Sequence, residues 1–419
     1  MARGFFASST LVATKAPVSL VPKCGACGFC NSCHSPKLPV SGKGRRRILI
    51  VGEFPSAADD EGGMHFVGES GSFLRGILDA VGLNMREDCW LTNAIICHPD
   101  GKTDKEIDSA VSYCRPVLMR TIQELDPVLI IPLGQLAVKS LIGGLWKEAD
   151  VGPITRWVGW RIPCQKPNVW ICPTFHPTFV RREKKQVLEA AFRRHLRAAA
   201  ELSERPWKTL PEPNKQVEVI LDTDEAARVI RRMKEKGGPI AVDYENTCLK
   251  PEYPGAEIVC CSLCWRGKKT IAYPWHGAAI EATKEILHSP NCQFIAANLK
   301  HEDRWTRHVF GRPVRVWLHD TMIAAHALDN RPHICGLKFQ AFVRLGAESY
   351  DDHIKRFLAA KGDARLNRVK TEVDMRQLLL YCGMDTLLEY WLAMVQRADL
   401  EHGPSSEPLH VNVCMPGSE

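Results

Sequence analysis

The sequence predicts an α/β protein built from two consecutive domains. A chain of 419 residues is too long for one ordinary hydrophobic core, so two domains are expected from length alone. Short apolar runs alternate with helical patterns up to residue 202, which is the order of a three-layer α/β/α domain. A proline-rich stretch, 203–216, then interrupts this order and is predicted to be a linker.

The first domain, 24–202, is predicted to hold a buried sheet between layers of helices. Its first strand, 48–51, is a continuous apolar run of the kind that parallel sheets bury on both faces. Further strands are predicted at 89–93, 128–133 and 170–173. The spacing of apolar residues predicts helices at 72–81, 105–125, 134–141 and 184–202.

The second domain, 217–402, is predicted to begin with strands and to end with helices. A strand at 217–221 and a helix at 223–236 lead to a buried strand at 240–244. Two β-rich runs, 258–265 and 270–274, are typical of a meander, and helical patterns dominate from there to His402. Outside the domains, 1–23 is predicted to be a flexible arm and 403–419 a frayed tail.

Charge and cysteine usage predict a nucleic-acid partner and a reducing compartment. The formal net charge is +7, and the surplus lies before residue 211, where 28 Lys and Arg face 20 Asp and Glu. The 17 cysteines are odd in number and follow no export signal, so a cytoplasmic location is expected. The acid-free start, with Arg3 and Lys15, leaves organelle import open. No apolar run has membrane-spanning length, so no membrane partner is expected.

Four cysteines in ten residues, Cys24, Cys27, Cys30 and Cys33, predict a metal site near the start of the first domain. Their regular spacing is close to the cysteine run that holds iron-sulfur clusters in bacterial ferredoxins, although the closing proline is missing. A zinc knuckle is the competing interpretation, but two residues between the pairs leave little chain to wrap a tetrahedral ion. A loop without metal is the third.

Polar side chains follow successive strands of the first domain. Glu53 and then Phe66 come after the first strand, Asn93 ends the second, and His176 follows the fourth. Loops at the carboxyl ends of parallel strands are the usual ligand sites of α/β domains. A ring to stack, an amide with a donor and an acceptor, and an imidazole to stabilise negative charge could together hold a flat polar ring.

This part of the chain, about 24–200, resembles the iron-sulfur uracil-DNA glycosylases. The chain departs from the family pattern at Phe54, a position that is usually small, at Ser56, which replaces glycine, and at His65, which replaces proline. The motifs that carry the resemblance are Cys24 and Cys27, Gly52-Glu53-Phe54-Pro55, Asp59-Asp60, Phe66-Val67-Gly68, Thr92-Asn93 with Cys97, Cys114, and His176-Pro177.

The resemblance implies hydrolysis of the bond between uracil and deoxyribose, after the nucleotide has been flipped out of the duplex. It implies that Phe66 stacks on the uracil, that Asn93 and Glu53 belong to the substrate site, and that His176 supports the departing anion. Asp59 is predicted to stabilise an oxocarbenium-like state or to position water.

The same resemblance implies a 4Fe-4S cluster with two ligands from each of two places. Cys24 and Cys27 would supply one pair, and Cys97 and Cys114, which lie beside the uracil-reading strand, the other. Cys30 and Cys33 remain as spares or alternates. The cluster is predicted to be structural, holding a basic loop beside the DNA-facing edge.

A set of acids in the second domain predicts a site for two divalent metal ions. Asp243 and Glu245 are separated by one residue on a predicted strand, so both side chains project from one face. Tyr381 and Asp385 lie four residues apart on a predicted helix and also share a face. Two metal ions held by carboxylates can activate a water and stabilise the leaving oxygen in phosphodiester cleavage.

The ordered set resembles the 3′-5′ exonuclease domain of A-family DNA polymerases, a ribonuclease-H-like fold, over about residues 217–400. The resemblance implies that Asp243, Glu245 and Asp385 bind the first of two Mg²⁺ or Mn²⁺ ions. Asp243 would bridge to the second ion, and Tyr381 would orient the attacking water.

The middle acid of this set stays open. The family spacing from Asn298 selects Glu302 as a ligand, whereas Asp303 is the chemically commoner residue, and Asp320 also matches an acid of the pattern.

Together the two resemblances predict a bifunctional hydrolase that acts on DNA, excising uracil and degrading strands from the 3′ end. Another hypothesis keeps the first domain as a non-catalytic uracil-binding or DNA-binding module that recruits the nuclease. The acids would equally serve a nuclease that acts on RNA. No polymerase segment follows residue 402, so the exonuclease domain is expected to be free-standing or to work for a polymerase encoded elsewhere.

Overall fold

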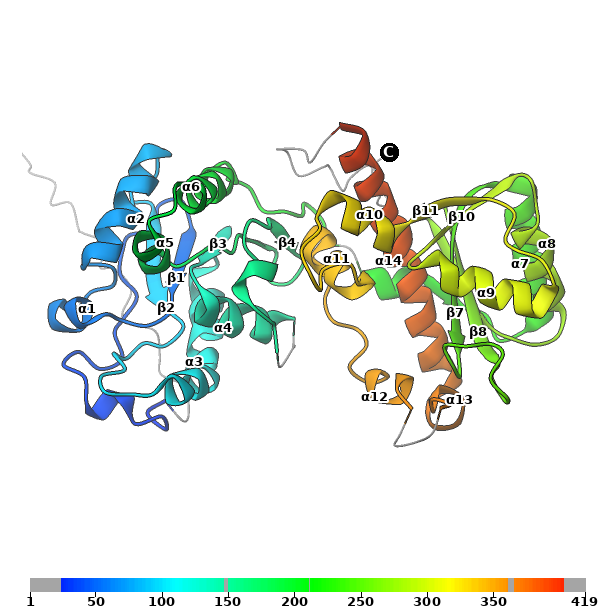
Figure 1. Ribbon diagram of the computed structural model, residues 1–419, viewed down its shortest axis with the longest axis horizontal. Helices are drawn as coiled ribbons and strands as arrows, with labels where there is room; N and C mark the ends of the chain where they lie inside the picture. The colour runs from blue at the N-terminus through cyan, green and yellow to red at the C-terminus, as the bar shows by residue number, and fades with distance from the viewer. Residues whose placement is uncertain (1–23, 147–149, 211, 361–364, 403–419) are drawn as a thin grey trace, which may run out of the picture. The chain divides into compact units, whose positions relative to one another are not determined.

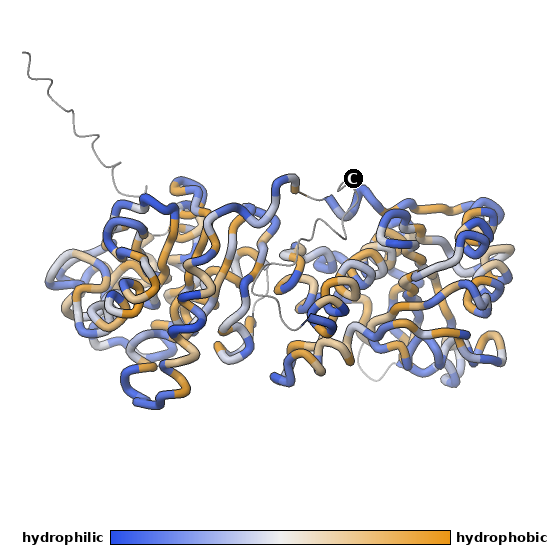
Figure 2. The backbone as a smooth tube through the Cα atoms, turned by 90° about the horizontal axis from the view of Figure 1, so that it is seen from above, coloured by the Kyte–Doolittle hydropathy of each residue, from blue (hydrophilic) through white to orange (hydrophobic). Residues whose placement is uncertain are grey.

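The computed structural model describes residues 24–146, 150–210, 212–360 and 365–402 (Figure 1). The predicted arm 1–23 and tail 403–419 lie outside the described residues. The chain divides into two compact units, the first made of Met1–Gly159 and Ile171–Glu204, the second of Trp160–Trp170 and Arg205–Glu419. In each unit, hydrophobic segments run through the interior and many outer segments are hydrophilic (Figure 2).

The first sheet has five strands in the order β2-β1-β3-β5-β4. Strand β1 pairs in parallel with both β2 and β3, so the carboxyl ends of these strands lie at one edge of the sheet. The strands are β1 (Ile48–Gly52), β2 (Cys89–Asn93), β3 (Leu129–Pro132), β4 (Ile162–Cys164) and β5 (Val169–Ile171). The helices are α1 (Ala57–Gly62), α2 (Glu69–Ala80), α3 (Asp104–Leu125), α4 (Gln135–Leu145), α5 (Pro177–Glu183) and α6 (Gln186–Ala200), with 3₁₀ turns η1 (Phe29–Asn31) and η2 (Ile154–Arg156).

The strands and helices predicted for the first domain are present, and further short elements accompany them. The helix predicted at 184–202 is α6, and α5, which ends where Lys184 adopts a left-handed backbone conformation (φ 49°), precedes it. The strand β4 and the short helices α1 and α5 were not predicted. Each spans fewer residues than the window in which a periodic pattern can be recognised.

The second sheet has six strands in the order β11-β10-β7-β8-β9-β6. The predicted meander is confirmed, since β7, β8 and β9 pair antiparallel in sequence. The strands are β6 (Val217–Val219), β7 (Gly238–Asn246), β8 (Ile258–Trp265), β9 (Lys269–Pro274), β10 (Cys292–Ala296) and β11 (Trp317–Asp320). The helices are α7 (Thr223–Lys236), α8 (Ala278–Leu287), α9 (Leu299–Phe310), α10 (Thr321–Leu328), α11 (Leu337–Leu345), α12 (Lys355–Leu358), α13 (Val369–Glu372) and α14 (Met375–His402), with the 3₁₀ turn η3 (Pro213–Gln216).

Strands β10 and β11 were missed because they lie between helices and are short. These two strands pair with each other in parallel, and β10 also pairs in parallel with β7. They extend the meander into the mixed sheet of a ribonuclease-H-like domain, which confirms the predicted fold class.

Helices cover both faces of the second sheet (Figure 1). Ile240, Val242 and Tyr244 of β7 pack in one core with residues of α7, α8 and α9, whereas Ala241 packs on the other face with α14. Successive side chains of a strand point to opposite faces, so β7 directs its odd-numbered residues toward α14.

The long helix α14 is the central element of that second face. Its length and composition would suffice to cross a membrane, but 83% of its most apolar window is buried inside the protein. Its apolar character therefore corresponds to contacts with β6, β7, β8 and β9 and with α10 and α11.

The backbone of α2 passes close to the Phe66 loop at Gly71. A Cβ atom on Gly71 would lie 2.0 Å from the Phe66 carbonyl oxygen. We expect Gly71→Ala to lower the free energy of unfolding by roughly 1–3 kcal/mol through this clash. Gly76→Ala, in the same helix with no atom within 4 Å, should instead raise it by up to about 1 kcal/mol. Denaturant unfolding of the two variants checks this, and equal stabilities would contradict the contact.

Candidate functional sites

The residues predicted to hold a flat base meet at one edge of the first sheet. Gly52, the last residue of β1, pairs with Asn93, the last residue of β2. A Cβ atom on residue 52 would lie 2.2 Å from Asn93 Oδ1 and 2.9 Å from Phe66 Cζ. The amide and the aromatic ring therefore converge over a glycine, and no larger residue would leave them in place.

Phe66 is held in an uncommon backbone conformation. Its φ of 56° lies in the left-handed region, which is unfavourable for an aromatic residue unless surrounding contacts impose it. The Arg86 guanidinium supplies such contacts, because Nη2 donates to the carbonyl oxygen of His65 at 2.6 Å and to that of Phe66 at 3.4 Å. The ring is 5% exposed, so it is placed by the fold before any ligand binds.

Glu53 and His176 lie beside each other at the start of α4 and α5. Glu53 Oε1 accepts a hydrogen bond from the backbone N–H of Leu136 at 3.0 Å, near the amino-terminal end of α4. Burial lowers the pKa of His176, and the Glu53 and Asp59 carboxylates partly oppose this shift. His176 Nδ1 accepts from the backbone N–H of Thr178 at 3.3 Å, so the neutral ring carries its proton on Nε2.

Asp59 and Asp60 are both buried and both bind backbone N–H groups. Asp59 accepts from Ser56 at 2.9 Å and from Val67 at 2.7 Å, which fixes both ends of the loop that carries Phe66. Asp60 accepts from His34 and Ser35, each at 2.7 Å, and so attaches the cysteine segment to the same helix. The catalytic role of Asp59 stays a prediction; in the structure both its carboxylate oxygens fix the loop.

The four cysteines predicted as ligands are neighbours. The pKa of Cys97 is raised to about 12, mainly by burial and further by Cys33, Cys114 and Cys27. Burial likewise raises that of Cys114 to about 11, with contributions from Cys27 and Cys24. These thiols are protonated at neutral pH unless a metal binds, because a coordinating thiol is deprotonated. Cys30 donates to the side chain of Asn31 at 3.5 Å.

The side chains present fit a cluster of several irons. Two cysteine pairs, Cys24/Cys27 and Cys97/Cys114, supply the four thiolates that such a cluster takes as ligands.

Phe54, one of the departures from the family pattern, belongs to the cysteine side of the sheet. It packs with Phe29, Ile95 and Ile96 against the cysteines. The larger side chain is thus accommodated in the core around the cysteine segment.

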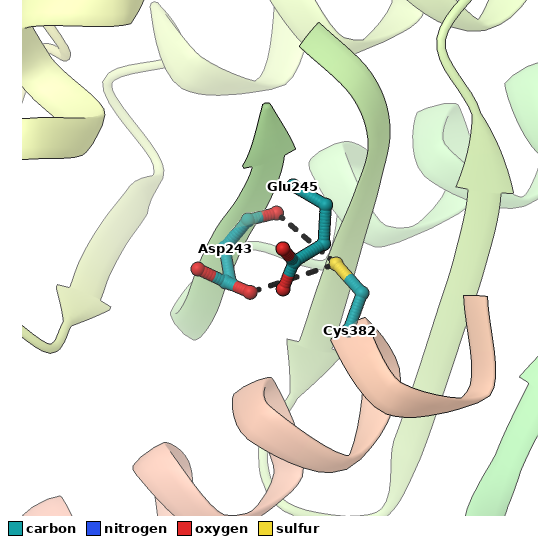
Figure 3. Close-up of side chains that lie close together, drawn as sticks. All are labelled: Asp243, Glu245 and Cys382. Carbon is teal, nitrogen blue, oxygen red and sulfur yellow. Dashed lines mark hydrogen bonds between the residues drawn. The ribbon is translucent and has the colours of Figure 1, made fainter. Parts of the chain in front are cut away.

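In the second unit, Asp243 and Glu245 point from β7 toward α14, where Cys382 meets them (Figure 3). The ligand atoms of these three residues lie within 4.8 Å of one another. The Cys382 thiol donates to Asp243 Oδ2 at 3.6 Å and lies 3.1 Å from Ser262 Oγ. Burial raises its pKa, so the thiol is a neutral neighbour of the acids.

Glu302, not Asp303, joins this acidic site. Glu302 is 4% exposed, and its pKa is raised by burial and by Asp243, Asp320 and Glu245. Asp303 instead accepts hydrogen bonds from Arg307, Val314 and Trp317.

Asp320 has a structural role at the start of α10. Its carboxylate accepts from the backbone N–H groups of Met322 and Ile323 within α10, and from those of Asn298 and Leu299 at the start of α9. These bonds orient α9, the helix that carries Glu302. Asp320 therefore supports the acidic site from outside it.

Tyr381 and Asp385 lie on one face of α14, as the spacing predicts, and a lysine lies against both. Lys338 of α11 contacts Asp385 Oδ1 and the Tyr350 hydroxyl, which itself contacts Asp385. The Lys338 ammonium lies 4.1 Å from the Tyr350 ring centre and 4.5 Å from that of Tyr381. Burial lowers the pKa of Lys338 to about 8.

Glu389, one turn beyond Asp385 on α14, is a further buried acid that sequence patterns missed. Its Oε1 accepts from the backbone N–H of Ala297 at 2.8 Å, next to the turn that begins α9. Lys338 and Tyr350 were also missed, since they lie on segments without a motif. Only the helical spacing of Glu389 from Asp385 could have suggested it.

The acids of this site fit divalent cations. Burial raises the pKa of Asp243 to about 6 and raises those of Glu245 and Glu302 well above their usual range. Glu302 Oε2 is buried without a hydrogen-bond partner. Buried carboxylates with a free oxygen are the hard ligands that Mg²⁺ prefers.

Comparison with known families agrees with this geometry. Residues 39–200 match the uracil DNA glycosylase superfamily, and residues 217–394 match a family described as 3′-5′ exonuclease. The solved structure of Escherichia coli RNase D, an exoribonuclease involved in structured RNA processing, matches 44% of this chain and 45% of its own, with a TM-score of 0.31 and 17% identity.

Similar proteins extend this result. The type-4 uracil-DNA glycosylase of Pyrobaculum aerophilum is 31% identical over 159 residues, which is 38% of this chain and 79% of that protein. The type-4 uracil-DNA glycosylase of Saccharolobus solfataricus is 30% identical over 161 residues, which is 38% of this chain and 73% of that protein. A DNA polymerase of Bacillus phage SP01 is 25% identical over 351 residues, and the match covers 75% of this chain and 36% of that protein. The chain therefore belongs to the type-4 uracil-DNA glycosylase family through its first domain and carries a 3′-5′ exonuclease domain after it.

Proposed function

We propose that the chain is a bifunctional DNA-processing hydrolase, which excises uracil from DNA and degrades DNA strands from the 3′ end. The observation that carries the first activity is the convergence of Phe66, Asn93 and His176 at the carboxyl edge of the first sheet. The second activity rests on the buried acids between β7, α9 and α14.

In the first domain, Phe66 stacks on the flipped uracil and Asn93 binds its edge. Cleavage of the glycosidic bond leaves negative charge on the base. His176, neutral and protonated on Nε2, donates a hydrogen bond to that anion. Glu53 and Asp59, the nearby carboxylates, favour the positive charge that develops on the sugar.

In the second domain, Asp243, Glu245, Glu302 and Asp385 are the proposed ligands of two Mg²⁺ or Mn²⁺ ions. Such ions supply an activated water and stabilise the leaving oxygen of the phosphodiester. Tyr381 stays protonated, because burial raises its pKa, and its hydroxyl is available to orient that water. Lys338 balances the carboxylates and keeps Asp385 in position.

We assign a 4Fe-4S cluster to Cys24, Cys27, Cys97 and Cys114, with a structural role. Asp60 attaches the residues after Cys33 to α1, so the cluster would hold the cysteine segment beside the loop that carries Phe66. A DNA polymerase is a proposed partner, since a phage polymerase matches segments of both domains. The cytoplasm, where thiols stay reduced, suits such a protein.

The glycosylase activity can be separated from the nuclease by removing divalent metal. With EDTA present, we expect the full chain to convert a uracil-containing oligonucleotide to an alkali-labile abasic product, because no residue of the first site needs a divalent ion. Asn93→Ala should reduce the rate by about 100-fold, as loss of a buried hydrogen-bonding partner implies. Binding of the uracil oligonucleotide without abasic product would instead support a non-catalytic recruiting module.

For the nuclease, Asp243→Asn should abolish 3′ digestion in Mg²⁺ or Mn²⁺, whereas Asp303→Asn should retain it, since Asp303 faces away from the acids.

Folding raises the pKa of Asp243, so this group favours the fold below about pH 4 and loses that contribution as pH rises through about 6. The metal-free Asp243→Asn variant should therefore be more stable than wild type at pH 8, by up to about 3 kcal/mol.

Thermal unfolding with and without Mg²⁺ measures this effect. Mg²⁺ should raise the melting temperature of wild type and leave Asp243→Asn unchanged. Equal Mg²⁺ responses in the two proteins would contradict the ligand assignment. Digestion of labelled RNA, compared with digestion of labelled DNA, shows which nucleic acid the exonuclease domain prefers.

The cysteine assignment predicts different costs for neighbouring thiols. Cys27→Ala should remove most iron and the broad visible absorbance from anaerobically purified protein. Cys30→Ala should retain both, because its side chain bonds to Asn31 rather than to the buried pair. Cys33→Ala is expected to retain iron as well, although Cys33 hydrogen-bonds to Cys97. Iron loss in Cys33→Ala with retention in Cys27→Ala would shift the ligand pair.

A further inference from the structure

The side chain that precedes Phe66 makes a contact that none of the roles above uses. His65 is completely buried, and its Nδ1 lies 2.9 Å from Asn93 Nδ2. It stands at the position where the family pattern has proline, a residue that could make no such contact. The histidine thus bonds directly to the amide that is proposed to read the base.

The contact between His65 and the NH₂ end of the amide assigns the proton of the imidazole ring. Burial lowers the pKa of His65 to about 4, so the ring is neutral at pH 7 and one ring nitrogen carries the proton. Nδ1 faces the NH₂ group of Asn93, which can only donate, and Nε2 has no hydrogen-bond partner among the described residues. The proton therefore resides on Nε2, Nδ1 is the acceptor, and the NH₂ end of Asn93 donates to it.

This bond fixes the direction of the Asn93 amide. With Nδ2 toward His65, Oδ1 lies toward Gly52 and the Phe66 ring, where the base would stack. A half-turn of the amide would set Oδ1 against the Nδ1 lone pair, and two acceptors cannot share a hydrogen bond. The His65 side chain cannot move away easily, because Arg86 holds its carbonyl and the Phe66 carbonyl that follows.

We propose that His65 is a positioning residue for base recognition, which orients Asn93 so that Oδ1 and the second Nδ2 hydrogen meet the uracil edge. Uracil offers N3–H as a donor and O4 as an acceptor, which matches this orientation. Cytosine offers an acceptor at N3 and a donor at N4, which matches the reversed amide. The inference rests on the proposed glycosylase function and adds the group that sets its preference for uracil.

A double-mutant cycle on the full chain tests the coupling. Excision is measured in EDTA under single-turnover conditions, on oligonucleotides with uracil or cytosine at one position. His65→Leu removes the acceptor, and His65→Phe removes it while keeping a flat ring, in case the leucine variant does not fold. Each is combined with Asn93→Ala. Cooperative unfolding reports that each variant is folded, and Mg²⁺-dependent digestion reports that the second domain is intact.

We expect either His65 variant to lower the uracil excision rate about 10-fold to 100-fold, the range that one buried hydrogen bond implies. In the Asn93→Ala background the same substitution should change the rate less than about 3-fold, because the amide it orients is gone. The ratio of uracil to cytosine excision should fall in the His65 variants.

Two results would overturn the inference. Equal effects of the His65 substitutions with and without Asn93 would show that His65 only fills space. If wild type excised uracil and both folded His65 variants kept its rate and base preference, this inference alone would fail. Absence of uracil excision by wild type would instead overturn the proposed glycosylase function, and this inference with it.

Discussion

Desolvation of ionisable groups is the constraint on which both candidate sites depend. Removing a charged group from water is costly unless a partner compensates, so burial favours the neutral form of histidine, cysteine and carboxyl side chains. In the first domain this keeps His65 and His176 neutral and able to act as directional hydrogen-bonding groups. In the second, it leaves carboxyl groups that a divalent cation can stabilise as carboxylates.

Strand geometry decides which side chains share these desolvated positions. Parallel pairing of β1 and β2 places Gly52 opposite Asn93, so an edge that looks like two separate loops in sequence is one site. In the second domain the two-residue period of β7 sends Asp243 and Glu245 to the face of α14, while Tyr244 between them packs in the opposite core. Strand pairing thus brings the residues of the first site together, and the two-residue period of β7 brings those of the second.

The sequence predicted mainly those residues whose position follows from a local period. Asn93 and the pairs Asp243/Glu245 and Tyr381/Asp385 were predicted because strand ends and residue spacing place them, whereas Glu389, one helical turn from Asp385, was missed. Lys338 and Tyr350 belong to segments without a motif, and only the packing of α11 against α14 brings Lys338 to Asp385. No spacing rule links residues 47 positions apart on different helices.

Asp59 is a predicted site residue whose hydrogen-bonding contacts the sequence could not show. Its residue type and its place after β1 suit a catalytic carboxylate, but sequence cannot show that both oxygens accept backbone N–H groups. The choice between Glu302 and Asp303 was undecidable for the same reason, since adjacent helical residues point in different directions. The direction is set by Asp320, which fixes the start of α9 from a separate strand.

Two departures from the family pattern, Phe54 and His65, have different surroundings. Phe54 enlarges the core around the cysteines, where added apolar volume is compatible with packing against Phe29 and Ile95. His65 replaces an apolar ring with one that has an acceptor, and a buried acceptor needs a donor. The donor it finds is Asn93, the residue proposed to select the base. A residue that does not contact the ligand can therefore change recognition. His65 does so by determining which polar atoms Asn93 presents to the base.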